Sequence, residues 1–423
     1  MVDKASIRGT KPWVKDLTTG EYITDFPSDI HFIRWHPSKP LLRFIHNDVD
    51  WEVDPYAPEP ENWQNINPVT LSGGWYKNQR PTNDDMHVTV WGRETSAANW
   101  DMWLVSQDGL EAEKIAFGNA KTNYWVFDQQ NQPVLRLDVL NPSTERLYRK
   151  QNDSWIQIAD IDVADDFYIL DDVAPDGTVL ARSARGRDKA ALVSLDVMTG
   201  EETVLIDNPN ADIGWPVKLG VTYQSDIVPM GVDTLDYAAI TDRGQVFLDI
   251  LSEFPQPITL GKTSPTASGR YLIQELSVQS QSFIHLLMNL DNKTYEVLSP
   301  FYFARYKEHL IQEQAVTFTA RDGLEIPAIL AMPEGAKDPI PFIVDIHGGP
   351  ASYTPLGYNR DMQFLVNRGY GVLSVNFRGS KGFGKAFQTK GYKEFGRAIS
   401  LQPTDKEATQ NLVRCESDLS RRN

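Results

Sequence analysis

Short apolar runs separated by turn signals fill the chain from about residue 12 to residue 300. In the plainest unit, strand-like segments at 191–196 and 202–206 flank a turn that ends at Gly200. Glycine suits such turns because it adopts positive φ without steric cost. Units of this kind recur about every 40–50 residues, which is the period of a β-propeller blade. The recurrent units lie at 102–115, 191–206, 247–260 and 283–298.

We therefore predict an all-β propeller of about six to seven blades over residues 1–311. About six units can be counted, and one is expected to be absent or incomplete before Met1. A pair of β-sandwiches is the alternative, because sandwiches are also built from short antiparallel strands. The propeller is favoured because no segment of helical period is evident in this region.

The character of the sequence changes near residue 315. The predicted elements from there on are strands at 316–320, 326–333, 341–346 and 370–377 and a helix at 361–368 that Gly369 closes. The continuous apolar run at 341–346 is typical of a buried parallel strand. The order of strand, loop, helix and strand is typical of an α/β domain. Residues 312–399 are therefore predicted to be the N-terminal part of such a domain, and residues 400–423 a polar tail.

The motif His347-Gly348-Gly349-Pro350 stands directly after the run 341–346. In α/β-hydrolases the loop at this place carries a motif of the HGGG type, whose backbone N–H groups face a developing oxyanion. Glycine allows that approach because a Cβ atom would obstruct the substrate carbonyl. A tight Gly-Gly turn without a catalytic role is the alternative. The motif thus predicts part of an oxyanion hole at Gly349.

Three segments carry a resemblance to a known family. They are Arg321-Asp322-Gly323, the HGGP motif and NRGYGVLSVNFRGSKGFGKAF at 367–387. Together they resemble the opening of the catalytic domain in the prolyl oligopeptidase family of serine peptidases, closest to its dipeptidyl- and acylaminoacyl-peptidase-like branch. The resemblance implies a seven-bladed propeller that caps an α/β-hydrolase domain. It also implies that the N–H of Gly349 contributes to the oxyanion hole and that His347 lines the loop.

The catalytic triad expected of this family is not found in the sequence. In α/β-hydrolases the triad follows the order Ser, Asp or Glu, then His, with the serine in a G-x-S-x-G turn. The sequence contains no such turn, and no histidine follows His347. Arg378-Gly379-Ser380-Lys381-Gly382 comes nearest, but Arg378 replaces the first glycine. We interpret Ser380 as a turn residue and predict no catalytic residue within this chain.

The end of the chain departs from the family pattern. The match holds to Arg397, and a polar segment without apolar periodicity follows. We hypothesise that the reading frame shifts near residue 399 and that the chain ends early within the catalytic domain. The triad is then expected beyond residue 423. Sequencing the gene downstream and reading its other frames would decide this hypothesis.

The resemblance implies a serine-type peptidase that hydrolyses short peptides through an acyl-enzyme, although this chain is predicted to be catalytically incomplete. A non-catalytic, peptide-binding propeller is the alternative, and an esterase-type α/β-hydrolase is a weaker one. In the aminopeptidase branches a glutamate pair from the propeller binds the free amine of the substrate. No local pattern identifies that pair among glutamates such as Glu201 and Glu202.

Composition excludes several partners and ligands. The formal charge of −16 disfavours nucleic acid and anionic membranes, because like charges repel. The single cysteine, Cys415, excludes an internal disulfide and a cysteine-rich zinc site. Acidic clusters such as Asp162-Asp165-Asp166 lack the register of a calcium loop and are interpreted as solvated strand ends. We therefore expect a peptide partner with no metal or cofactor, and leave a homo-oligomer open.

The sequence does not fix the compartment. No apolar run approaches the roughly 18–20 residues of a transmembrane helix. Residues 1–6 contain no apolar core of a secretion signal, so the chain as written is expected in the cytoplasm. A periplasmic location would follow if the N-terminus is also truncated.

Overall fold

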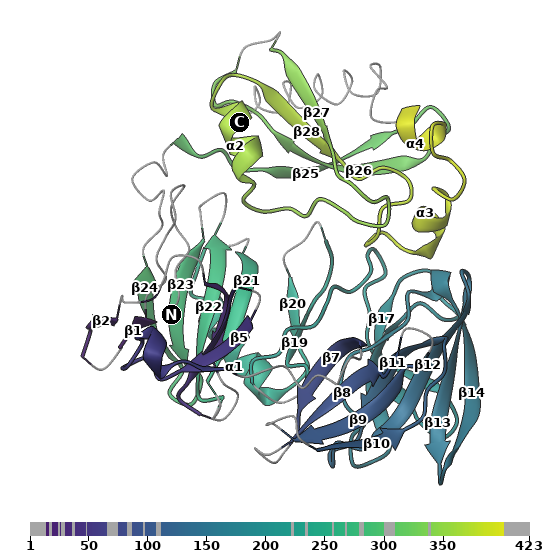
Figure 1. Cartoon of the computed structure of the whole chain (residues 1–423). Coiled ribbons are helices and arrows are strands. Elements are labelled where there is room, and N and C mark those ends of the chain that lie inside the picture. Colours follow the sequence, from purple (N-terminus) through teal and green to yellow (C-terminus); the bar gives the residue numbers. More distant parts are fainter. Residues whose placement is uncertain are drawn as a thin grey trace. The chain divides into compact units, whose positions relative to one another are not determined.

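The computed structural model describes residues 14–401 of the chain, with gaps (Figure 1). The gaps are 17–18, 24–25, 27–29, 36–38, 48, 66–74, 83–86, 96–97, 107–110, 221–223, 233–235, 256–257, 267–268, 279–282, 300–308 and 337–339. Nearly all of the predicted tail 400–423, including Cys415, therefore lies outside the described residues. The chain divides into two compact units, one of residues 1–140 and 146–157 and one of residues 141–145 and 158–423.

The first unit is built from antiparallel sheets that follow one another along the chain. A short pair, β1 (Val14–Lys15) with β2 (Tyr22–Ile23), precedes two four-stranded sheets. The first of these contains β3 (His31–Trp35), β4 (Leu42–His46), β5 (Val49–Val53) and β6 (Gln64–Asn65), with the short 3-10 helix η1 (Pro60–Asn62) before β6. The second contains β7 (Trp75–Pro81), β8 (His87–Arg93), β9 (Asp101–Ser106) and β10 (Ala112–Ala116). The last two strands confirm the predicted unit at 102–115.

The boundary between the two units falls within the third four-stranded sheet. Its strands are β11 (Thr122–Phe127), β12 (Pro133–Asn141), β13 (Thr144–Gln151) and β14 (Ser154–Asp162). The 3-10 helix η2 (Val163–Asp165) follows, with Asp162 as its N-cap. Asp162 accepts a hydrogen bond from the N–H of Ala164, which satisfies a donor that the short helix leaves free.

The second unit begins with two more antiparallel four-stranded sheets, separated by a short strand pair. They are β15 (Tyr168–Ile169), β16 (Thr178–Ser183), β17 (Ala191–Asp196) and β18 (Glu202–Ile206), then the pair β19 (Ile227–Pro229) and β20 (Tyr237–Ala239), then β21 (Ile258–Pro265), β22 (Tyr271–Val278), β23 (Ile284–Asn289) and β24 (Thr294–Ser299). Strands β17 and β18 confirm the predicted segments 191–196 and 202–206, and Gly200 between them has a φ of +75°. Strands β23 and β24 confirm the predicted unit at 283–298.

The predicted strand unit at 247–260 is wrong, because a helix occupies its first half. Helix α1 (Asp242–Leu251) begins at Thr241, whose hydroxyl accepts the N–H of Gly244. Apolar side chains at 247, 250 and 251 lie on one helical face and pack against the sheet β21–β24. The expectation that no helix interrupts the β-rich region is therefore also wrong.

The last sheet has mixed strand directions. It contains β25 (Gln314–Thr319), β26 (Glu325–Ala331), β27 (Phe342–Ile346) and β28 (Gly371–Val375), in the order β25-β26-β28-β27. Strands β27 and β28 are parallel, and the other neighbours are antiparallel. The accompanying helices are α2 (Arg360–Val366), α3 (Lys385–Thr389) and α4 (Ala398–Leu401). These elements confirm the strands and the helix predicted between 316 and 377.

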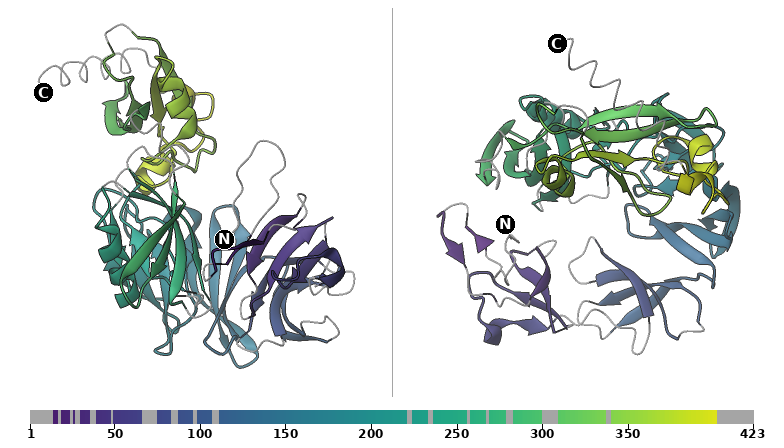
Figure 2. Two further views of the ribbon diagram at one scale, coloured as in Figure 1. Left: turned by 90° about the vertical axis from the view of Figure 1, so that its left-hand side faces the viewer. Right: turned by 90° about the horizontal axis from the view of Figure 1, so that it is seen from above.

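Both faces of this sheet contribute to apolar cores. Met362 and Val366 of α2 pack against Ile329, Ala331 and Val372 on one face. Figures 1 and 2 show helix α2 beside the sheet. Phe383 and Phe387 pack against the other face. Strand β28 is buried throughout, but β27 is only half-buried, and Ile346 is 50% exposed. The prediction that 341–346 is a buried strand is therefore wrong, because β27 lies at the edge of the described sheet. Among the described residues, no helix has the length and hydropathy needed to cross a membrane.

Candidate functional site

The HGGP motif and the glycine-rich segment after β28 meet at one edge of the last sheet. Because β27 and β28 are parallel, with Ile346 opposite Val375, the loops that follow them leave the sheet side by side. The ring of His347 stacks on that of Phe377 at 4.6 Å between centroids. Its Nε2 atom is 2.9 Å from Ser380 Oγ. The structure therefore brings together the two segments that the sequence singled out separately.

Gly349 has backbone geometry that favours glycine. Its φ is +140°, and a Cβ atom there would lie 2.9 Å from the backbone nitrogen of Ala351. The peptide bond that joins it to Pro350 is cis. Within the described part of the chain, no acceptor is hydrogen-bonded to the N–H of Gly349. An exposed N–H at the end of a strand can bind a carbonyl oxygen or an oxyanion.

Ser380 and His347 resemble a nucleophile with its base, but their surroundings differ from those of an exposed catalytic serine. Ser380 has no exposed surface, and its hydroxyl donates to the carbonyl of Phe377 at 2.6 Å. The other ring nitrogen of His347, Nδ1, lies 2.8 Å from the carbonyl of Gly348, and no carboxylate is hydrogen-bonded to it among the described residues. In this structure the Ser380 hydroxyl is enclosed and contacts the His347 ring and the Phe377 carbonyl, so the pair joins the two loops. The interpretation of Ser380 as a turn residue agrees with this geometry.

The glycine-rich segment lies close against the rest of the second unit. Gly382 and Gly384 both have φ above +90°. A Cβ atom at Gly382 would lie 2.5 Å from a methyl of Val232, and one at Gly384 would lie 2.5 Å from Lys189 Nζ. Glycine is thus required here by both conformation and space.

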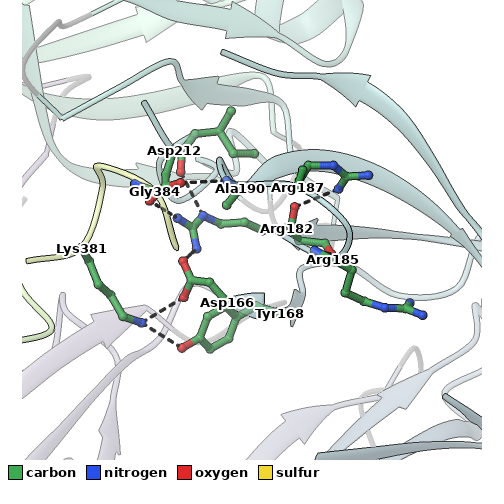
Figure 3. Close-up of polar contacts among 11 residues, drawn as sticks. Asp166, Tyr168, Arg182, Arg185, Arg187, Ala190, Asp212, Lys381 and Gly384 are labelled. Atoms are coloured by element: carbon green, nitrogen blue, oxygen red, sulfur yellow. Dashed lines mark hydrogen bonds and ion pairs between the residues drawn. The ribbon is translucent and has the colours of Figure 1, made fainter. Parts of the chain in front are cut away.

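A network of charges joins this segment to the sheet β15–β18 (Figure 3). Lys381 Nζ is 3.0 Å from Asp166 Oδ1 and donates to the Tyr168 hydroxyl at 3.3 Å. Asp166 also pairs with Arg182, whose Nε donates to the carbonyl of Ile213. Burial would raise the pKa of Asp166, but the charges of Arg182 and Lys381 outweigh burial and lower this pKa. Asp166 is therefore ionised in the folded protein at neutral pH.

A second group of contacts extends this junction. Asp212 accepts the N–H of Ala190 at 2.7 Å and the N–H of Gly384 at 3.1 Å, and its own N–H donates to Gly382. Lys385 forms an ion pair with Asp165. A carboxylate that accepts backbone N–H groups from two segments fixes the position of both segments. The segment is thus bound to the sheet along its length.

These ion pairs correct the interpretation of the acidic clusters for Asp165, Asp166 and Asp171, whereas Asp162 is exposed at the end of β14. Asp166 is 6% exposed and forms ion pairs with two cationic side chains. Asp171 pairs with Lys218 at 3.0 Å. They are bound carboxylates, not solvated strand ends, and sequence spacing could not show partners so distant along the chain. No group of residues suited to hold a metal ion occurs among the described residues.

Glu202 also has partners. Its side chain is nearly buried and accepts hydrogen bonds from Ser183, Arg185 and Arg187. Two guanidinium groups already neutralise this carboxylate. A free substrate amine would have to displace them, so Glu202 is a poor candidate for the amine-binding pair.

Sequence comparisons find peptidases. No family model matches the chain. Over 286 residues the chain is 28% identical to dipeptidyl aminopeptidase BIII of Pseudoxanthomonas mexicana, a match that covers 64% of this chain and 39% of that protein. Over 122 residues it is 34% identical to dipeptidyl peptidase family member 6 of Caenorhabditis elegans, covering 23% of this chain and 16% of that protein. The chain thus spans well under half of the length of these relatives.

Fold comparison agrees with the sequence relatives. The crystal structure of puromycin hydrolase matches with a TM-score of 0.64 at 17% identity, over 93% of this chain and 66% of that one. The fold is thus that of propeller-containing peptidases. Relatives and structural neighbours together confirm the resemblance to the prolyl oligopeptidase family.

Proposed function

We propose that the chain descends from serine-type peptidases that cleave short peptides through an acyl-enzyme. The observation that carries this proposal is the HGGP segment after β27, with Gly349 at positive φ and its N–H without an acceptor among the residues that the structure describes. We further propose a β-propeller of six to seven blades over residues 1–311, a partial α/β-hydrolase domain over 312–399 and a separate tail at 400–423. The successive four-stranded antiparallel sheets support the first of these assignments.

In this mechanism a serine attacks the peptide carbonyl, a histidine moves the proton and an aspartate orients the histidine. The N–H of Gly349 donates to the carbonyl oxygen as it gains negative charge. His347 and Gly348 shape the loop, and Pro350 ends it. One such donor contributes about 3–4 kcal/mol to stabilising the transition state in enzymes of this type.

The chain as it stands is proposed to be unable to form the acyl-enzyme. Its 423 residues contain no G-x-S-x-G turn, and Ser380 is buried. A fluorophosphonate probe, which labels activated serines, should therefore leave the purified chain unlabelled. An active serine hydrolase in the same reaction confirms that the probe is competent. Stoichiometric labelling of the chain would show that a nucleophile exists and that the proposal of inactivity is wrong.

A peptide-binding protein without turnover is the second candidate, and one observation favours it. Trp215 is 54% exposed, and no other tryptophan whose side chain is described is among the exposed large apolar residues. It forms an edge-to-face pair with Tyr168 at 4.8 Å, and the guanidinium of Arg182 lies 5.8 Å from its ring. Exposed aromatic side chains held by their neighbours are common anchors in binding surfaces.

Calorimetric titration of the chain with short peptides tests this second candidate. Trp215→Ala should weaken the binding of a peptide with aromatic side chains by about fivefold or more. Tyr295→Ala is a matched control, because Tyr295 is also an exposed aromatic residue but lies in β24 and contacts Phe254, which follows α1. Equal losses in the two variants, or no affinity for any peptide, would count against a peptide-binding role for Trp215.

A further inference from the structure

We infer that Lys381 is a positioning residue that fastens the HGGP segment to the sheet β15–β18. The inference rests on the proposed function only in that this segment is the one proposed to hold the oxyanion. The contacts themselves lie within the second compact unit and need no bound substrate. They fall into two groups, one on the side of the sheet and one on the side of the HGGP segment.

On the side of the sheet, Lys381 binds a carboxylate that cannot move freely. Asp166 accepts the ammonium group at 3.0 Å and is also paired with Arg182. The Tyr168 hydroxyl is a second acceptor at 3.3 Å. The side chain of Asp166 is 7% exposed and that of Lys381 is 27% exposed. This ion pair is screened less by water than a surface pair, and it holds the lysine side chain in one direction.

On the side of the loop, Lys381 and its neighbour contact both ends of the HGGP segment. The backbone N–H of Lys381 donates to the carbonyl of Ser352, just after the motif, at 3.0 Å. The preceding residue, Ser380, contacts the ring of His347, the first residue of the motif. Two consecutive residues thus hold the segment 347–352 at its beginning and near its end. Any shift of this dipeptide moves both attachment points together.

A neighbouring lysine shows that this arrangement is specific. Lys385 also forms an ion pair with the sheet side, through Asp165. Its backbone N–H, however, donates to Asp188, and none of its hydrogen bonds in the described structure reaches residues 347–352. Both ion pairs dock the same segment, but only that of Lys381 continues into the HGGP segment. The orientation of the Gly349 N–H therefore depends on Asp166, although Asp166 does not touch the motif.

Amide hydrogen exchange of the full chain tests the inference. Lys381→Met keeps the aliphatic stem and removes the ammonium group, so exchange of the hydrogen-bonded Ser352 amide in 347–352, and of the residue-381 amide that donates to Ser352, should accelerate about fivefold or more. The matched control Lys385→Met removes the other ion pair and should leave exchange in that segment within about twofold of the original chain. Asp166→Asn removes the same interaction from the opposite partner and should reproduce the effect of Lys381→Met.

The NMR chemical shift of the His347 ring is a second measurement, and a general loss of stability would not change it. Its carbon–proton correlation, assigned with His347→Asn, should shift in Lys381→Met and in Asp166→Asn but not in Lys385→Met. Unchanged exchange and an unchanged ring signal in Lys381→Met would overturn the inference. Equal effects of Lys381→Met and Lys385→Met would also overturn it. Neither reading uses peptides or turnover, so failure here leaves the proposed function to be judged separately.

Discussion

At the scale of single residues, Glu313 shows how burial sets the charge of a side chain. Glu313 is 7% exposed and accepts the N–H of Asn359 at 3.0 Å. Burial raises its pKa to about 7, although hydrogen bonds from Asn359, Gly357 and Gln363 favour the charged form. Gln363 in turn holds both the N–H and the carbonyl of Ile311. Glu313 therefore lies in a cluster that fastens the start of the last sheet to α2.

We predict that Glu313 makes the protein less stable as the pH rises. The folded-state pKa lies above the unfolded value of 4.5, so the stabilising contribution is complete below pH 4.5 and is lost as the pH rises through about 7. The full effect is about 3 kcal/mol at most. Glu313→Gln should flatten the dependence between pH 5 and pH 8 and be the more stable form at pH 8. Urea unfolding at several pH values measures this.

The exposed residue Glu325 provides the control for that comparison. Its carboxylate accepts the hydroxyl of Thr319 at the surface of β26. Glu325→Gln makes the same substitution at an exposed position, and the change of slope in Glu313→Gln is measured against it. A slope unchanged by Glu313→Gln would mean that Glu313 is not the group responsible.

At the scale of single elements, helix α1 shows where a local pattern misled. The pair Arg243-Gly244 reads as a turn, and the apolar residues after it read as a strand. In the structure Gly244 lies inside the helix, where a Cβ atom would be 2.0 Å from the carbonyl oxygen of Asp226. The glycine is there because another segment passes close by, and that cannot be seen from neighbouring residues. The i, i+3, i+4 spacing of 247, 250 and 251 was the available signal.

Gly244→Ala should destabilise the protein despite the higher helix propensity of alanine. Propensity alone would favour alanine by about 1 kcal/mol. Contact with the backbone of Asp226 forces the helix to move, and overpacking of this kind costs about 1–3 kcal/mol or more. Thermal unfolding should show a net loss. Gln245→Ala, at the next and exposed position of α1, should change stability by less than about 0.5 kcal/mol. A stabilised Gly244→Ala variant would contradict the close approach.

Strands were predicted more accurately where an apolar run is followed by a residue typical of turns. Strands β17 and β18 have the bounds that the sequence indicates, because both are apolar runs and the turn at Gly200 separates them. The sequence predicted the bounds of β27 correctly, but the prediction that β27 is buried was wrong. An apolar run indicates the type of element. Its burial depends on the order of strands in the sheet, and neighbouring residues do not determine that order.

At the scale of the whole molecule, the candidate site depends on contacts between distant parts of the sequence. Lys381 and Asp166 are 215 residues apart, and Lys385 and Asp165 are 220 apart. The HGGP motif could be recognised from sequence because its glycines and its place after a strand are local features. The ionic network that holds the adjoining segment could not, because no local spacing relates its members.

The half-exposed strand β27 should make the whole chain prone to association. An edge strand with exposed apolar side chains can pair with another chain. Ile346→Lys places a charge at this edge and should slow the growth of light scattering at high protein concentration. Val204→Lys, at an exposed position of the edge strand β18, is the control and should have a smaller effect. Equal effects of the two substitutions would show that association does not occur through β27.

The strand order of the last sheet also constrains when its parts form during synthesis. Strand β27 is made before β28, yet β28 is the neighbour with which it pairs in the described sheet. The ribosome must therefore release residues up to about 375 before β27 gains its hydrogen bonds, while β25 and β26 pair as soon as they emerge. The HGGP segment acquires its place only at that late step. Its place thus depends on residues that are made after it.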